Sequence, residues 1–211
     1  MADYKKPDYW QQKARKEGYP ARSVYKLMEI DEKFSLFKTS PIRVLDLGAA
    51  PGSWSLYLLR LMQRSKTAGN SFLAAADLSP LSREYDKGLF DSGNFFFIQG
   101  DITGVAVRET LFAKGPYSTI ISDAAPATTG NHTVDAARSL ELAETVFFYA
   151  ENALAPGGNL ALKVFQGGDS ATLLKRMKTL FGTAKSFKPQ SCRGESVETY
   201  FVGLGKEYNV K

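Results

Sequence analysis

The stretch VLDLGAAPGSWS, residues 44–55, runs from an apolar segment through a glycine turn into the start of a helical pattern. Gly48 and Gly52 allow the backbone to turn tightly and to approach a ligand, and Pro51 stiffens the bend. The phosphate-binding spacings GxGxxG and GxxxxGKS/T are both absent. The stretch therefore predicts a strand, a turn and a helix around a ligand site that is not the usual phosphate cradle.

Outside this stretch, strand-like apolar runs alternate with helical patterns. The strand-like runs are residues 43–48, 72–78, 94–101, 117–124, 159–165 and 198–205. Helical patterns cover residues 53–66, 134–154 and 169–182, and two shorter helices are expected at 8–17 and 21–34. Strands that are apolar almost throughout are typical of a parallel sheet covered on both faces. The pattern predicts one doubly wound α/β sheet with helices on both faces.

Length and composition fit a single domain over residues 1–211. Of the 211 residues, 44% are hydrophobic and 23% are charged, close to the average of globular domains. No apolar run reaches the ~18 residues of a membrane span, and the N-terminus lacks the apolar core of a secretory signal. Cys192 is the single cysteine, which excludes an internal disulfide and favours a reducing compartment. We expect a cytoplasmic protein that does not enter a membrane.

Positive charge gathers near the N-terminus. Residues 1–26 hold seven lysines and arginines against three acidic residues, so they carry +4 of the formal net charge of +5. Five aromatic side chains lie among these cations. Because cations bind phosphates and rings stack on unpaired bases, we predict a basic N-terminal helical arm, about residues 1–34, that contacts nucleic acid. The alternative is an amphipathic helix whose aromatic side chains pack on the body of the protein.

Acidic residues recur where the predicted strands end. Asp46, Asp77, Asp101 and Asp123 each close a strand-like run. In a doubly wound sheet these carboxyl ends meet at one crevice, which is where ligands bind. Ionised carboxylates only accept hydrogen bonds, so they suit a ligand with an ammonium, ribose hydroxyls and an adenine amino group, as in S-adenosylmethionine. Alternatively, Asp77 and Asp101 are turn or N-cap residues.

Seven motifs carry a family resemblance. They are ARSVYKLMEI, DLGAAPGSWS, ADLSP, QGD, SDAAP, LAPGGNLALKVFQG and SVETY, and they follow one another within residues 9–205. In this order they closely resemble the FtsJ/RrmJ family of RNA 2′-O-ribose methyltransferases. The resemblance implies a Rossmann-like class I methyltransferase fold with a mostly parallel seven-stranded sheet. It also implies S-adenosylmethionine as methyl donor, S-adenosylhomocysteine as product and RNA as partner.

The resemblance also implies the site residues. The Lys-Asp-Lys-Glu tetrad that catalyses the family's reaction falls here on Lys26, Asp123, Lys163 and Glu198. The cofactor-binding positions fall on Gly52, Trp54, Asp77, Asp101 and again Asp123. No metal ligand is implied. The single histidine, His132, is expected in a loop or at the start of a helix, and Cys192 is given no role.

Ribose methylation explains why these residue types are needed. The methyl group passes from a sulfonium to a 2′-hydroxyl by in-line displacement, and the hydroxyl is a poor nucleophile until a base removes its proton. We expect Lys163 to be this base, because burial and a neighbouring cation favour a neutral amine. Asp123 is expected to orient Lys163 or the hydroxyl, and Glu198 to hold the lysines in place. Trp54 has a second interpretation as a packing residue beside the cofactor.

The RNA substrate is less clearly marked. The compact chain with its short basic arm resembles the branch of the family that methylates a uridine of large-subunit ribosomal RNA. However, GYPARSVYKLMEIDEKF and PGSWS are similar to the branch that acts on tRNA anticodon loops. We favour ribosomal RNA and expect a monomer. Whether the loop that contains Arg193 and Glu195 contacts RNA stays open.

Two other classes of function remain as alternatives. A nicotinamide-dependent oxidoreductase needs a GxGxxG turn with an acid about 20 residues later, and this chain has neither. A catalytically silent RNA-binding or assembly factor does not need an intact tetrad, so the presence of all four residues argues against it.

Overall fold

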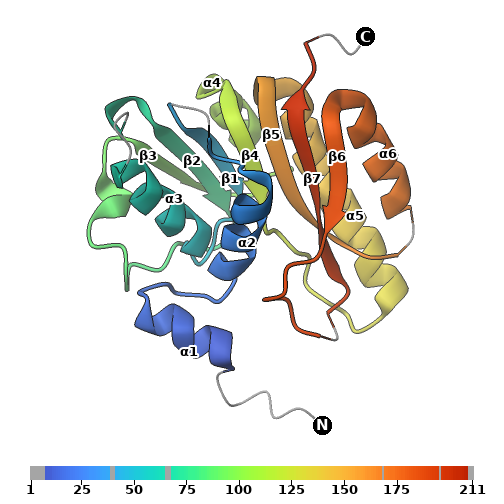
Figure 1. Ribbon diagram of the computed structural model, residues 1–211, viewed down its shortest axis with the longest axis horizontal. Helices are drawn as coiled ribbons and strands as arrows, with labels where there is room; N and C mark the ends of the chain where they lie inside the picture. The colour runs from blue at the N-terminus through green and yellow to red at the C-terminus, as the bar shows by residue number, and fades with distance from the viewer. Residues whose placement is uncertain (1–7, 39–40, 65–67, 168, 195, 209–211) are drawn as a thin grey trace.

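A computed structural model gives the fold (Figure 1). The residues that it describes are 8–38, 41–64, 68–167, 169–194 and 196–208. The helices are α1 (Tyr9–Lys16), α2 (Val24–Phe34), α3 (Ser53–Arg64), α4 (Val105–Ala113), α5 (His132–Ala153) and α6 (Ser170–Leu180). The strands are β1 (Arg43–Leu47), β2 (Phe72–Asp77), β3 (Phe95–Gln99), β4 (Tyr117–Ser122), β5 (Leu154–Phe165), β6 (Phe181–Phe187) and β7 (Glu198–Lys206). Two short 3-10 helices are η1 (Ala68–Asn70) and η2 (Leu89–Asp91).

The strands form one seven-stranded sheet in the order β3-β2-β1-β4-β5-β7-β6. The pairs from β3 through β5 are parallel, whereas β7 is antiparallel to both of its neighbours. The chain order reverses between β1 and β4, where a doubly wound sheet forms its ligand crevice. The predicted mostly parallel sheet of seven strands is therefore confirmed.

Helices cover both faces of the sheet, and each face has its own hydrophobic cluster (Figure 1). Alternate residues of β1 show the division, since Val44 points to one cluster and Leu45 to the other. The cluster under α1, α2 and α3 includes Ala14, Leu27, Ile30, Leu56 and Leu59. The cluster under α4, α5 and α6 includes Leu111, Val146, Phe147, Leu173 and Met177.

Two elements were not expected from the residue patterns. The strand β6 lies in a segment whose surface-facing residues interrupt the apolar pattern, and it follows α6 without a loop. The helix α4 buries only Val107 and Leu111, so its amphipathic pattern is weak. The strand β6 is stabilised by its pairing with β7, and α4 by the packing of Val107 and Leu111 in the core. Local propensity alone is a poor predictor of such short elements.

The turn after β1 is shaped by close backbone contacts. Gly48 has a φ of +77°, and a Cβ there would lie 2.5 Å from the Cβ of Ala124. Gly52 has a φ of +105°, and a Cβ there would lie 2.9 Å from the Phe90 ring. Both positions therefore require glycine, and the turn lies against the end of β4 at Gly48 and against η2 at Gly52. Among the described residues, no helix is both long and apolar enough to span a membrane.

Candidate active site

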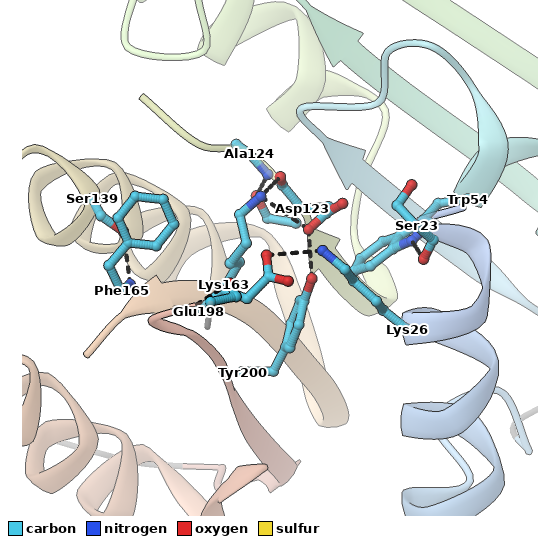
Figure 2. A network of polar contacts seen from close by, with 12 residues as sticks. Ser23, Lys26, Trp54, Asp123, Ala124, Ser139, Lys163, Phe165, Glu198 and Tyr200 are labelled. Atoms are coloured by element: carbon cyan, nitrogen blue, oxygen red, sulfur yellow. Dashed lines mark hydrogen bonds and ion pairs between the residues drawn. The ribbon is translucent and has the colours of Figure 1, made fainter. Parts of the chain in front are cut away.

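The four residues of the predicted tetrad lie together, although they come from four separate elements (Figure 2). Lys26 is in the first turn of α2, and Asp123 directly follows β4. Lys163 lies near the end of β5, and Glu198 begins β7. The structure thus brings together residues as far as 172 positions apart.

Two ion pairs join the tetrad. The Nζ atom of Lys26 lies 2.8 Å from Oε2 of Glu198, and Nζ of Lys163 lies 3.0 Å from Oδ1 of Asp123. The amine of Lys163 also donates to the backbone carbonyl of Asp123. Each lysine is only 9% exposed. Buried charges of this kind are tolerated because each one is paired and hydrogen-bonded.

The pairing decides the protonation of three tetrad members. Burial works to lower the pKa of Lys26, but the carboxylates of Asp123 and Glu198 outweigh it and hold that pKa above its usual value. Burial works to raise the pKa of Asp123, but the ammonium groups of Lys163 and Lys26 hold it below its usual value. For Glu198, the charge of Lys26 likewise outweighs burial and lowers the pKa. Lys26 is therefore a fixed cation between two fixed anions.

Tyr200 is a further member of this network that the sequence motifs did not single out. Its hydroxyl donates to Oδ1 of Asp123 over 2.5 Å, and its side chain is fully buried. The motif VETY did indicate that Tyr200 lies near the tetrad, because Glu198 and Tyr200 are two residues apart on one strand and so face the same side.

Cys192, to which the sequence assigned no role, also contacts the tetrad. Its buried thiol donates a hydrogen bond to Glu198, which contributes to the lowered pKa of that carboxyl. Burial raises the pKa of the Cys192 thiol to about 12. The side chain is therefore a neutral donor and not a reactive thiolate.

Trp54 is buried, with 2% exposure, at the start of α3. Its indole N–H donates to the backbone carbonyl of Ser23 over 2.8 Å, and its ring lies 6.0 Å from that of Tyr200, centroid to centroid. The backbone N–H of Lys26 donates to the same carbonyl. Trp54 therefore fastens the first turn of α2, which carries Lys26.

A cavity of about 130 Å³ opens at the carboxyl ends of β1, β2, β3 and β4. Its lining includes Gly48, Asp77, Gly100, Asp101, Ile102 and Ala124. Two of the five predicted cofactor-binding residues, Asp77 and Asp101, are among them. Asp123 adjoins the cavity through Ala124, whereas Gly52 and Trp54 lie outside this lining, at the beginning of α3.

Asp77 and Asp101 accept hydrogen bonds from backbone N–H groups in the turns on which they lie, as the alternative interpretation as turn residues predicted. Oδ1 of Asp77 accepts from the N–H of Ser79 over 2.8 Å, and its Oδ2 accepts from Ala50 over 2.9 Å. Oδ1 of Asp101 accepts from Thr103 over 2.8 Å, which lowers the pKa of this carboxyl. These bonds keep both carboxylates in place at the edge of the cavity.

Asp46 is a buried carboxyl on β1. Its Oδ2 accepts from the Ser55 hydroxyl over 2.7 Å, while Oδ1 has no hydrogen-bond partner among the described residues. Burial, with a contribution from the nearby Asp123 and Asp77 charges, raises the pKa of Asp46 to about 7. Asp46 does not line the cavity, and the raised pKa favours the neutral carboxyl, which costs less to bury than a carboxylate.

A second opening lies beside the tetrad. It measures about 290 Å³ and is lined by Ala21, Arg22, Ser23, Lys26, Arg193, Ser196 and Glu198. Three of these residues carry positive side chains. Within the ranges that the structure describes, no group of three or more His, Cys, Asp and Glu side chains is arranged to hold a metal ion.

The sheet order and the acid-lined cavity at its switch point define a Rossmann-like class I methyltransferase. The family profile of FtsJ-like methyltransferases matches residues 19–206 of the chain. The protein belongs to this family. The predicted enzyme class and methyl donor are thereby confirmed, so the chain is an S-adenosylmethionine-dependent methyltransferase.

Two curated relatives are similar over almost their whole lengths. The ribosomal RNA large subunit methyltransferase E of Treponema denticola is 48% identical over 95% of this chain and 96% of its own. The protein of the same name from Borreliella afzelii is 43% identical over 93% of this chain and 96% of its own.

Solved structures agree with the fold. A structure from Plasmodium falciparum, described as a ribosomal RNA methyltransferase, has a TM-score of 0.73 and 26% identity, over 90% of this chain and all of that one. The Thermus thermophilus 16S rRNA N2 G1207 methyltransferase, solved with AdoMet and guanosine, has a TM-score of 0.56 and 19% identity, over 90% of this chain and 44% of that one. The latter likeness shows the fold alone.

Proposed function

We propose that the protein methylates the ribose 2′-hydroxyl of an RNA nucleotide, and that its substrate is a uridine of large-subunit ribosomal RNA. The observation that carries the proposal is the assembly of Lys26, Asp123, Lys163 and Glu198 into one cluster beside the acid-lined cavity. A ribose hydroxyl requires a base, and a buried lysine is a suitable one.

The residues have separate roles in this proposal. Lys163 takes the proton of the 2′-hydroxyl, and Asp123 holds the Lys163 amine in place through its carboxylate and its backbone carbonyl. Lys26 stays an ammonium because two carboxylates stabilise its charge. Lys26 also lies close enough to Asp123 to stabilise the charge of that carboxylate together with Lys163.

The cavity holds the methyl donor in this proposal. The donor supplies a methyl group on a sulfonium, which is electrophilic without further activation. Asp77 and Asp101 present carboxylate oxygens to hydroxyl and amino groups, and Ile102 and Leu142 provide apolar wall. Gly52 and Trp54 shape the turn and the helix start behind it.

Support for RNA comes from the second opening and from the relatives. Arg22, Lys26 and Arg193 line that opening, and cations of this kind attract phosphates. The relatives from Treponema denticola and Borreliella afzelii are named for ribosomal RNA of the large subunit, which favours this substrate over tRNA. We further propose a cytoplasmic monomer, one domain over residues 1–211 with a basic arm at about 1–34.

The test is a methylation assay with total RNA from a strain that lacks the gene. The protein is incubated with this RNA and donor labelled in the methyl group, and the label is mapped to nucleotide and atom. We expect label on a 2′-oxygen of large-subunit RNA, and none with the Lys163→Ala variant. Label in the tRNA fraction would favour the anticodon loop instead, and label on a base would contradict ribose chemistry.

A further inference from the structure

One carboxylate oxygen of the tetrad has two donors. Oδ1 of Asp123 lies 3.0 Å from Nζ of Lys163 and accepts from the Tyr200 hydroxyl over 2.5 Å (Figure 2). The tyrosine and the lysine therefore compete for the negative charge on the same atom. A hydrogen bond to a carboxylate disperses its charge, so the oxygen attracts an ammonium less strongly than it would alone.

The strands fix this arrangement. Lys163 of β5 and Tyr200 of β7 are direct partners in the antiparallel register, so their side chains lie next to each other on one face. The Tyr200 ring packs against Trp54, and it is fully buried. Direct contact between this side chain and a bound RNA is therefore excluded by its burial.

Tyr200 remains a hydroxyl donor throughout the working pH range. Burial, reinforced by the charges of Asp123 and Glu198, raises the pKa of its phenol well above the usual value. The other titratable groups around the Asp123 carboxylate are Lys26 on α2, Asp46 on β1, Cys192 before β7 and Glu198 on β7. Of these, Lys26 and Cys192 hold fixed protonation states, since the pKa of each is raised.

We propose that Tyr200 is a positioning residue, which occupies the shared Asp123 oxygen and thereby eases the release of the proton from Lys163. The proposal deepens the proposed function, because it rests on Lys163 as the base. Tyr200 touches neither the donor nor the RNA in this account. It acts through Asp123 alone.

The test compares Tyr200→Phe with the wild type and with Tyr117→Phe. Tyr117 is a matched control, because it is also a fully buried tyrosine and its hydroxyl donates to the Leu111 carbonyl, away from the tetrad. In Tyr200→Phe, we expect the acid limb of the kcat profile to move up by about half a pH unit or more, with the KM for the donor unchanged. In Tyr117→Phe, we expect the profile to stay in place.

A second measurement does not depend on activity. The lysine side-chain signals of the donor-free protein are followed by NMR as the pH is changed, and the Lys163 signal is assigned from its loss in Lys163→Arg. We expect the Lys163 titration midpoint to rise in Tyr200→Phe and not in Tyr117→Phe. An equal midpoint in all three proteins overturns the proposal, whatever the assays show.

A failure of the proposed function and a failure of the role of Tyr200 give different results. If the wild type transfers no methyl group to ribose, the proposed function fails, while the NMR titration still tests the role of Tyr200. If Tyr200→Phe does not fold, the protein is instead labelled with 3-fluorotyrosine, whose more acidic hydroxyl is a stronger donor. The Lys163 midpoint is then expected to fall, and an unchanged or raised midpoint contradicts the proposal.

Discussion

The cavity proposed for the methyl donor and the tetrad lie at the same edge of the sheet, but they are built in different ways. In the cavity, Asp77 and Asp101 are held by backbone N–H groups two residues further along the chain. In the tetrad, buried side chains from four elements hold one another through ion pairs. A site fixed by local backbone bonds tolerates the loss of a neighbouring side chain, whereas a buried charge cluster does not. Substitutions in the two regions should therefore have different consequences.

The largest effect is expected from Lys163→Ala. Loss of a general base typically lowers kcat by about 10²- to 10⁴-fold, and the cavity should still bind the donor because its acids are untouched. Turnover is measured with a ribosomal RNA fragment, and donor affinity is measured by calorimetry. The control is Lys178→Ala on the exposed surface of α6. Normal turnover combined with weakened donor binding would contradict the division between the two regions.

Asp77→Ala is expected to weaken donor binding more than it lowers turnover. The variant removes the carboxylate that faces the cavity and the acceptor for the Ser79 and Ala50 N–H groups. We expect donor affinity to fall roughly tenfold to a hundredfold, since a hydrogen bond to a charged group contributes about 1.5–3 kcal/mol. Calorimetry of donor binding gives the measurement, with the exposed Asp91→Ala as control. A variant that binds the donor normally but turns over slowly would show that Asp77 does not hold it.

A smaller effect is expected from Trp54→Phe, which leaves the Ser23 carbonyl without the indole donor. We expect the free energy of unfolding to fall by about 1–3 kcal/mol, because a packing change adds to the lost hydrogen bond. Turnover should fall more than donor affinity, since the first turn of α2 carries Lys26. Denaturant unfolding and kinetics are compared with Trp10→Phe, whose ring packs against Tyr9 and Tyr25. Unchanged turnover would mean that Lys26 does not depend on this anchor.

A further effect is a pH dependence of stability from Asp46. Its pKa is raised to about 7 in the fold, against a usual value near 3.8, so the folded state binds the proton more tightly than the unfolded state does. The stability that this proton contributes is complete below the usual pKa of 3.8 and is lost progressively as the pH rises through about 7. Asp46→Asn should remove this dependence. Unfolding midpoints are measured at pH 5 and pH 8, and an equal pH dependence in both proteins rules the effect out.

The fold was largely predictable from the sequence, because its strands are buried on both faces and leave nearly continuous apolar runs. Asp77 and Asp101 were also predictable, since each one ends a strand at the crevice that the topology creates. The contacts of the tetrad were not, because no local pattern shows that Lys26 and Glu198 meet across 172 positions. Their pairing rested on the family resemblance. The shared oxygen that joins Tyr200 to Lys163 required coordinates, because it depends on strand register.

The place of β7 in the chain has a consequence for biosynthesis. This strand is the last in sequence, yet it lies between β5 and β6 and contributes both Glu198 and Tyr200. When the ribosome has translated as far as β6, both lysines and Asp123 have already been made. The strand that separates β5 from β6 is then still missing. In the proposed mechanism, methylation therefore waits until β7 has emerged from the exit tunnel and inserted into the sheet.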